Sequence, residues 1–223
     1  MNFKFQISNL KFLICAFLLL LFVSASQASA ELTADTNHNR VTIDFFYNGS
    51  TMSVKGVYDP GADLVIKLTS PDGHEALKRK GKVGGVLWMN VGALEMENVP
   101  GIYFLHSTKK IEDILSAGEI EKHVIGYPAL QKHVEMNPVT DDAEKAKWFE
   151  EFVRFKEHSR LYSVSTGKIS LTQKDGKGNY YIKIEWPYQV PPGKYDVTVY
   201  AVKNGKVSET AQNSITVEQV GTV

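Results

Sequence analysis

The sequence is very poor in cysteine. Its one cysteine, Cys15, lies in an apolar stretch near the N-terminus, and none follows it. A chain with a single thiol forms no internal disulfide and offers no thiolate cluster to a metal ion. If residues 1–30 are removed after export, the mature chain contains no thiol at all.

The sequence also lacks net charge and a second long apolar run. Its 25 Lys and Arg balance its 25 Asp and Glu, and loss of residues 1–30, which carry Lys4 and Lys11 but no acid, leaves 23 basic against 25 acidic residues. General nucleic-acid binders are strongly basic, so we expect no nucleic-acid partner. A membrane-spanning helix needs about 20 apolar residues, and no run of that kind follows residue 30, so we expect no transmembrane span in the mature chain.

Common catalytic motifs are missing too. There is no Gly-x-Ser-x-Gly elbow and no phosphate-binding P-loop. Ser165–Lys168 reads "STGK", the Ser-x-x-Lys spacing of penicillin-interacting enzymes, but the companion Ser-Asp-Asn and Lys-Thr-Gly elements are absent. His74 and Glu75 are not followed by the second histidine of a zincin. We therefore predict a protein that is not an enzyme, with no catalytic residue and no cofactor.

Histidines are present, but not at ligand spacing. Zinc and copper sites prefer close pairs of ligands or a carboxylate partner. His123 and His133 are ten residues apart, across Pro128, and would converge only through tertiary structure. We interpret the histidines as surface or half-buried imidazoles and predict no metal site. The six are His38, His74, His106, His123, His133 and His158.

The N-terminus has the layout of a cleavable signal peptide. Lys4 and Lys11 flank the start of an apolar core at residues 12–23, and "ASA" precedes Glu31. Such a signal has three parts, which are a positively charged start, a short apolar core and small residues at positions −3 and −1 before the cleavage site. We expect cleavage after Ala30 and a periplasmic or secreted mature chain of residues 31–223. If the segment is retained, the protein is membrane-anchored instead.

Residues 31–107 predict a β-sandwich-like lobe. Val41 to Tyr47 and Thr51 to Val57 alternate apolar and polar residues on either side of Asn48–Gly49, which is the pattern of a β-hairpin because Asn and Gly tolerate positive φ. Further short apolar runs at residues 62–68 and 101–106 are separated by Pro and Gly turns. Frequent turns between short strands are typical of sandwiches.

In residues 108–160 the apolar residues no longer alternate with polar ones but recur at helical spacing, which predicts a helical segment. Residues 107–119 suggest a first helix, with Ser107 or Thr108 as N-cap and Gly118 as its end. A second helix begins at Asp141, with Glu144 three residues on as in a capping box. Its aromatic stripe predicts a core-facing surface. The stripe consists of Trp148, Phe149, Phe152, Val153 and Phe155.

Residues 161–223 predict a second β-rich lobe. Tyr180, Ile182, Ile184 and Trp186 fall on one face of an alternating strand, and Asn204–Gly205 predicts a second hairpin. The fold class is therefore mainly β with a helical middle segment, built of immunoglobulin-like sandwich lobes. We expect two lobes, with one sandwich split by a helical insertion as the alternative.

The most basic stretch is "KRKGKVGGVLWMN", Lys78 to Asn90. In an extended chain Lys78, Lys80 and Lys82 share one face, and they form a candidate anion-binding site. Three lysines on an edge strand also prevent edge-to-edge aggregation, and we favour that interpretation. The glycine pair allows a bend, after which we expect Val86 and Trp88 to turn inward.

Four stretches in this order resemble a known family. They read "KRKGKVGGVLWMN", "ENVPGIYFLHSTKKIEDI", "EEFVRFKEHSRLYS" and "VPPGKYDVTVYAVKNGKV", and they resemble the alpha-proteobacterial family of putative transmembrane proteins over about residues 41–221. The resemblance implies a signal peptide, an extracytoplasmic β-rich region and a C-terminal membrane helix. Members of that family often accompany sulfite-exporter-like permeases, so the resemblance also implies a role in the envelope or in membrane transport. It implies no catalytic residue. This sequence ends at "VEQVGTV", about where that helix would begin, which favours a soluble periplasmic form.

These observations predict a non-catalytic exported module. The first hypothesis is a binding or accessory protein that serves an envelope or membrane transport protein, with a permease-like membrane protein as partner. The alternative is a periplasmic protein that binds a small anion or a metal through the basic strand or the histidines.

Overall fold

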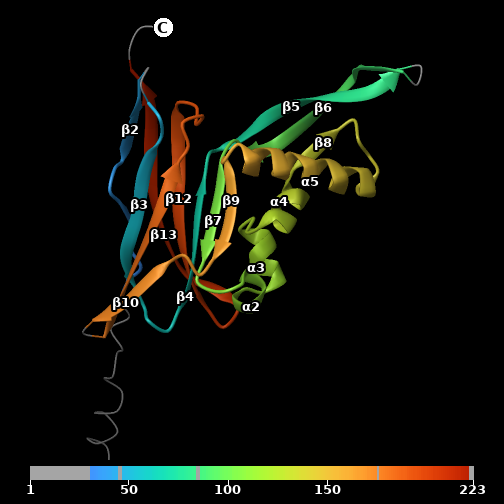
Figure 1. The fold of residues 1–223 in the computed structure, drawn as a ribbon. Coiled ribbons are helices and arrows are strands. Elements are labelled where there is room, and N and C mark those ends of the chain that lie inside the picture. Colours follow the sequence, from blue (N-terminus) through green and yellow to red (C-terminus); the bar gives the residue numbers. More distant parts are fainter. Residues whose placement is uncertain (1–30, 45–46, 84–85, 175, 221–223) are drawn as a thin grey trace, which may run out of the picture.

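The computed structural model describes residues 31–44, 47–83, 86–174 and 176–220, and for residues 79–83 and 88–91 it describes the backbone alone. This part of the chain is mainly β, with a helical insertion between its N-terminal and C-terminal strands (Figure 1). The predicted fold class is thereby confirmed.

Two sheets form a sandwich. The first has the order β1-β3-β11-β10, and the second has the order β2-β13-β12-β4-β7-β9. Most neighbours are antiparallel, but β2 runs parallel to β13, and β7 parallel to β9. The strands are β1 (Asp35–Thr36), β2 (Arg40–Ile43), β3 (Ser50–Tyr58), β4 (Asp63–Thr69), β7 (Tyr103–Ser107), β9 (Tyr162–Thr166), β10 (Ser170–Lys174), β11 (Lys177–Trp186), β12 (Gly193–Lys203) and β13 (Lys206–Gln219).

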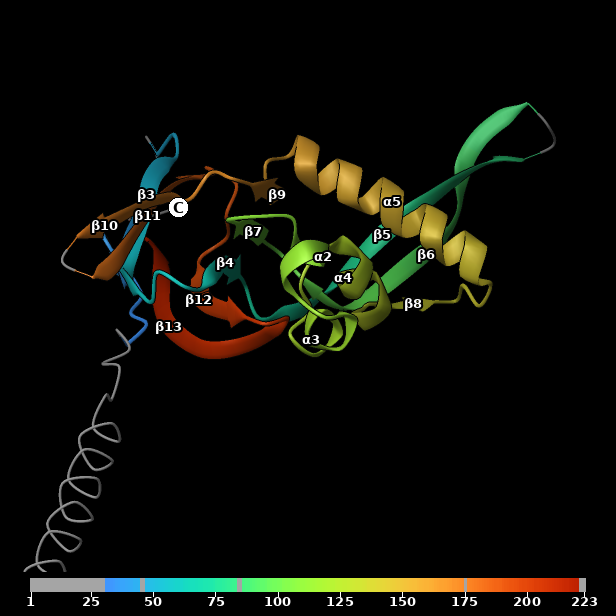
Figure 2. The same ribbon diagram turned by 90° about the horizontal axis from the view of Figure 1, so that it is seen from below.

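A third layer lies beside the six-stranded sheet. It contains four helices and a smaller sheet of order β5-β6-β8, and Figure 2 shows the helices gathered on one side of the sandwich. Strands β5 and β6 run out of this layer as a long two-stranded ribbon (Figure 1). The elements are β5 (Asp72–Val83), β6 (Leu87–Pro100), α2 (Ile111–Ile114), α3 (Ala117–Lys122), α4 (Tyr127–His133), β8 (Glu135–Asn137) and α5 (Asp142–His158).

The expectation of two separate lobes is corrected to the split-sandwich alternative. In the first sheet β3, from residues 31–107, pairs with β11, from residues 161–223. In the second sheet β4 lies between β7 and β12 in the same way. Strand pairing at such separations in the sequence is decided by long-range contacts, so the local period of each segment does not show which segments share a sheet.

The sandwich core explains why the strands of the two sheets have different burial patterns. Strand β11 alternates exposed and buried residues along its whole length, because only its inner face packs on the other sheet. The side chains predicted to share that face, Tyr180, Ile182, Ile184 and Trp186, are all buried in this core. The one-faced pattern read from the sequence is confirmed.

Central strands of the six-stranded sheet are buried on both faces. On β4, Leu64, Ile66 and Leu68 enter the core between the sheets, whereas Val65 enters a second core under the helices. On β7, Phe104 belongs to the first core and Leu105 to the second. Two-sided burial requires continuous apolar runs, which is why these strands alternate poorly in the sequence.

The two Asn-Gly sites have different outcomes. Asn204 and Gly205 have φ angles of 52° and 77° and join β12 to β13 as an antiparallel hairpin, as predicted for a type I′ turn. The hairpin expected around Asn48–Gly49 is wrong, because β2 and β3 belong to different sheets. Gly49 still has a positive φ of 97°, but here the turn carries the chain across the sandwich.

The helical segment is predicted well only in its second half. Helix α5 begins after Asp141, whose carboxylate accepts a hydrogen bond from the Glu144 amide at 2.8 Å. Its aromatic stripe is buried at Phe149 and Phe152, but Phe155 is 59% exposed. The first helix is in fact two short ones, α2 and α3, and Gly118 lies inside α3 rather than at its end. The N-cap of α3 is Ser116.

Candidate functional site

The lysines of the basic stretch lie on an edge strand. Strand β5 is the outer strand of its sheet, and Lys78 is exposed on it. The side chains of Lys80 and Lys82 lie outside the described residues, so the three-lysine anion site stays a prediction. The expected inward turn of Val86 is wrong, since 82% of its surface is exposed; the side chain of Trp88 lies outside the described residues.

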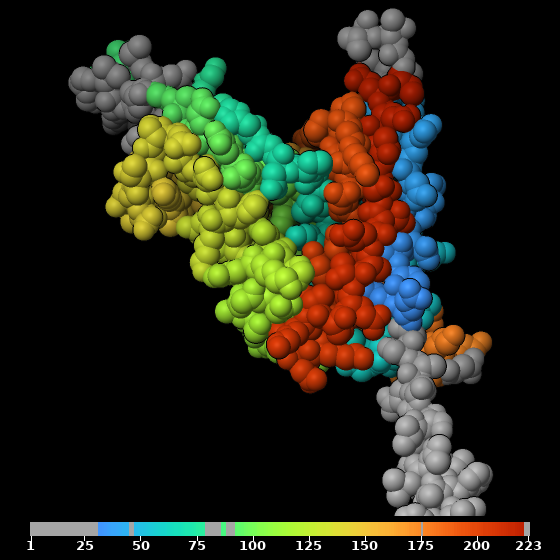
Figure 3. All heavy atoms as spheres, turned by 180° about the vertical axis from the view of Figure 1, so that it is seen from behind, coloured from blue at the N-terminus to red at the C-terminus, as the bar shows by residue number. Residues whose placement is uncertain are grey.

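The ribbon of β5 and β6 leaves the body of the protein beyond Leu77 and Leu94, which face each other across it. We call residues 78–83 and 87–93 the distal ribbon. Strand β8 covers β6 only at Glu95–Glu97, so within the described residues the distal ribbon has no third strand. From behind, the ribbon and the helices diverge from the sandwich (Figure 3). At the tip, Val86 and Leu87 are 82% and 62% exposed.

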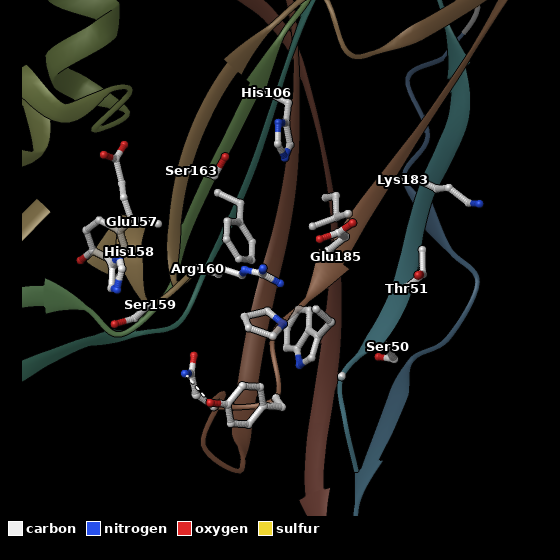
Figure 4. A pocket seen from close by; sticks show the side chains of 18 of the residues that line it. Ser50, Thr51, His106, Glu157, His158, Ser159, Arg160, Ser163, Lys183 and Glu185 are labelled. Atoms are coloured by element: carbon white, nitrogen blue, oxygen red, sulfur yellow. Dashed lines mark hydrogen bonds between the residues drawn. The ribbon is translucent and has the colours of Figure 1, made fainter. Parts of the chain in front are cut away.

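A cleft of about 1090 Å³ opens at one edge of the sandwich. It lies where β7, β9 and the end of α5 approach the start of β3 and the end of β11 (Figure 4). Polar residues make up most of its lining. They include Ser50, Thr51, His106, Glu157, His158, Ser159, Arg160, Ser163, Lys168, Lys183, Glu185 and Gln189.

His106, which lines the cleft, pairs with Ser165. They lie opposite each other on the parallel strands β7 and β9, and the imidazole Nδ1 is 2.6 Å from the serine hydroxyl. Burial, and then repulsion by Lys168, lowers the pKa of His106 to about 4. An imidazole of that pKa is a weak base at neutral pH. At neutral pH His106 is therefore uncharged, and the pair forms a hydrogen bond between the two strands.

Two buried ring nitrogens at the cleft have no hydrogen-bond partner among the described residues. They are Nε2 of His106 and Nε1 of Trp186. Their residues are only 6% and 1% exposed, and both line the cleft. A buried polar group without a partner is destabilising by about 1–3 kcal/mol, and native proteins keep few of them.

Arg160 is held at the cleft by the end of α5. The Arg160 amide donates to the Glu157 carbonyl at 2.9 Å, and the Leu161 amide donates to the Lys156 carbonyl at 2.8 Å. This is the Schellman pattern, in which the C′ residue is normally glycine. Arg160 instead adopts a φ of 57°, a strained position for a residue with a Cβ. Its guanidinium extends into the cleft (Figure 4).

The histidines do not gather. His74 pairs with Glu95 at 2.7 Å and His133 with Asp72 at 2.8 Å, both at the surface and in separate places. His123 lies 3.6 Å from Glu119. Across the described ranges there is no group of three or more His, Cys, Asp or Glu side chains that would hold a metal ion.

Sequence reasoning missed the cleft. In the sequence, His106 is one histidine of six, and Lys168 belongs to a Ser-x-x-Lys tetrapeptide without its companion motifs. Arg160 and Glu185 carried no motif. One local signal was present at the end of the second predicted helix. Glycine normally follows the end of a helix, and here Arg160 takes that place.

The fold and its surfaces define a class: a β-sandwich split by a helical insertion, with a projecting ribbon and a polar edge cleft. The chain belongs to the family described as "Putative transmembrane protein (Alph_Pro_TM)", whose model matches residues 31–223. This confirms the resemblance carried by the four sequence stretches. No curated protein and no solved structure matches the chain significantly. None of the helices in the described ranges is long and apolar enough to cross a membrane.

Proposed function

We propose that this protein is an exported, non-catalytic accessory module that docks on an envelope or membrane transport protein. The exposed tip of the β5–β6 ribbon is the observation that carries the proposal. The signal-like N-terminus and membership of a family described as putative transmembrane proteins support the location and the kind of partner.

The distal ribbon has the properties of a docking arm. Seven residues of β6 extend it by about 20 Å, given a rise of about 3.3 Å per residue. A two-stranded ribbon alone in water is at best marginally stable, so a partner that covers it adds stability. Val86 and Leu87 present apolar surface at the tip, and such surface favours burial at an interface.

The base of the arm is firmly attached. Leu94 and Met96 enter the core beneath the helices, and Glu75 on β5 forms an ion pair with Lys156 on α5. A fixed base sets the position from which the ribbon leaves the body of the protein. Binding through such a preorganised arm loses less conformational entropy than binding through a loose loop.

Site-specific photo-crosslinking in cells tests the proposal. A photoreactive amino acid replaces Leu87 at the tip, and in a matched strain it replaces Leu171, an exposed apolar residue on β10. We expect the Leu87 position to yield a discrete adduct with an envelope or membrane protein, identified by mass spectrometry. Equal adducts at both positions, or adducts with cytosolic proteins only, would refute the proposal.

A substitution at the ribbon tip provides a second test of the proposal. Leu87→Asp places a charge on the tip, and Leu171→Asp is the control of equal chemistry. For this test the photoreactive amino acid is placed at Val86 instead of Leu87. We expect Leu87→Asp to abolish the crosslink from that position while the melting temperature of the purified chain stays unchanged. An undiminished crosslink would show that the tip is not the docking surface.

A further inference from the structure

Strand β11 has a free edge along its second half. Strand β10 pairs with β11 only from Lys177 to Tyr181, whereas β3 pairs with it as far as Trp186. From residue 182 to residue 186, β11 therefore has a partner strand on one side alone, counting all residues that the structure describes. An edge of this kind presents unpaired peptide groups.

The register identifies these peptide groups. The Asn37 amide donates to the Ser53 carbonyl at 3.2 Å, so the peptide groups of Ser53 face away from β11. Lys183 lies directly opposite Ser53. Residues opposite each other in an antiparallel pair exchange both hydrogen bonds or neither, so the peptide groups of Lys183 face away from β3. By the same alternation those of Glu185 also face the free edge.

This free edge opens onto the cleft. Four consecutive residues of β11, Lys183 to Trp186, line it, although successive side chains of a strand point to opposite faces. Such lining indicates that the cleft runs along the strand's edge. The opposite wall includes Tyr162 and Ser163 of β9, which is itself the last strand of the other sheet.

The cleft carries a small excess of positive charge, three cations against the two carboxylates of Glu157 and Glu185. Arg160, Lys168 and Lys183 line it, and none of them forms an ion pair with a described residue. Of the two carboxylates there, Glu157 accepts a hydrogen bond from Tyr127 at 2.8 Å. Unpaired cations favour an anionic occupant.

We infer that the cleft binds an extended acidic peptide segment of a partner protein, which adds as a strand to the free edge of β11. Peptide strands recognised in this way gain affinity from main-chain hydrogen bonds and specificity from alternate side chains. Lys183 and Glu185 supply the main-chain groups. Arg160 and Lys168 select the acidic side chains. This inference concerns another surface than the ribbon tip and does not depend on the proposed docking arm.

Hydrogen exchange tests the inference on residues 31–223. The probe is a capped eight-residue peptide of alternating Val and Glu, compared with the same peptide carrying Lys in place of Glu. We expect the Val–Glu peptide to slow amide exchange at Lys183 and Glu185 at least tenfold, and the Lys peptide to leave it unchanged. Absence of binding at millimolar peptide, unchanged exchange at both amides, or equal effects of the two peptides would overturn the inference.

Three variants separate the main-chain contribution from the charge. Proline is tolerated where a strand's N–H faces away from the sheet, so Lys183→Pro removes one edge donor and retains the β3 ladder. We expect it to weaken peptide binding at least tenfold, and Lys183→Gln, which keeps the amide, less than fivefold. Gln173→Pro, placed on the outer edge of β10, is the control without effect. Equal losses in the first two variants would assign binding to charge alone and overturn strand addition.

Discussion

Lys156 on α5 and Glu75 on β5 form a partly buried ion pair between the helical insertion and the base of the ribbon. The side chain of Lys156 is only 4% exposed and that of Glu75 34%. The ammonium also lies 5.3 Å from the ring centre of Phe152 and 5.9 Å from that of Tyr162. One cation thus connects the arm, the helix and the aromatic core between them.

We predict that Lys156→Ala lowers the free energy of unfolding by about 2–3 kcal/mol. Loss of one partner of a buried pair costs about 3–5 kcal/mol, and the partial exposure of Glu75 reduces this. Lys156→Met, which keeps the apolar stem, should recover part of the loss. Urea denaturation measures the change. Lys147→Ala on the exposed side of the same helix is the control, expected within about 0.5 kcal/mol of wild type; an equally small effect at Lys156 would contradict the prediction.

A second prediction concerns pH. Burial lowers the pKa of His106 from 6.5 to about 4, so between these values the unfolded chain takes up a proton that the folded protein does not. The stability that neutral His106 contributes is fully present above pH 6.5 and is lost as the pH falls towards 4. Between pH 7.5 and 4.5, the free energy of unfolding of wild type should fall by about 2–3 kcal/mol more than that of His106→Asn, at 1.36 kcal/mol per pKa unit.

Urea denaturation at the two pH values checks this prediction. The control is His38→Asn, at an exposed site, which should behave like wild type. Parallel pH profiles for wild type and His106→Asn would refute it.

A third prediction concerns the strained end of α5. Arg160→Gly should stabilise the fold by about 0.5–1 kcal/mol, because glycine adopts positive φ without a Cβ clash and this gain exceeds its entropic cost. The melting temperature and the urea midpoint both measure the change. Arg154→Gly, inside the same helix, should destabilise by about 1 kcal/mol. Stabilisation together with weaker binding of the acidic peptide would show that Arg160 is retained for binding; a loss of stability would contradict the strain argument.

A fourth prediction concerns the leader. In cells the mature chain should begin at Glu31 and fractionate with the envelope, as mass spectrometry of the N-terminal peptide will show. Ala28→Asp combined with Ala30→Asp removes the small residues that the peptidase requires. The doubly substituted chain should retain residues 1–30. Recovery of the uncleaved wild-type chain from cytosol would contradict export.

Much of the local structure was predictable because it depends on neighbours in the chain. Alternation in residues 180–186 predicted the inner face of β11, and Asp141 predicted the start of α5. The cleft was not predictable, since its walls come from β3, β7, the end of α5 and β11. Nor was the exposure of Val86, because an apolar residue after a glycine pair has the same local pattern at a ribbon tip as in a core.

The sequence by itself determined the residues that turn, the faces that alternate, the charge balance and the signal-like start, all of which follow from the chemistry of adjacent residues. Tertiary structure alone decided that β4 lies between β7 and β12, and that β11 lies beside β3. Strand pairing is set by side-chain packing between distant segments, and the same period-two pattern is compatible with many partners. Because strands from both predicted lobes pair with each other, the protein has one split sandwich instead of two lobes. The same pairing leaves the second half of β11 with a free edge.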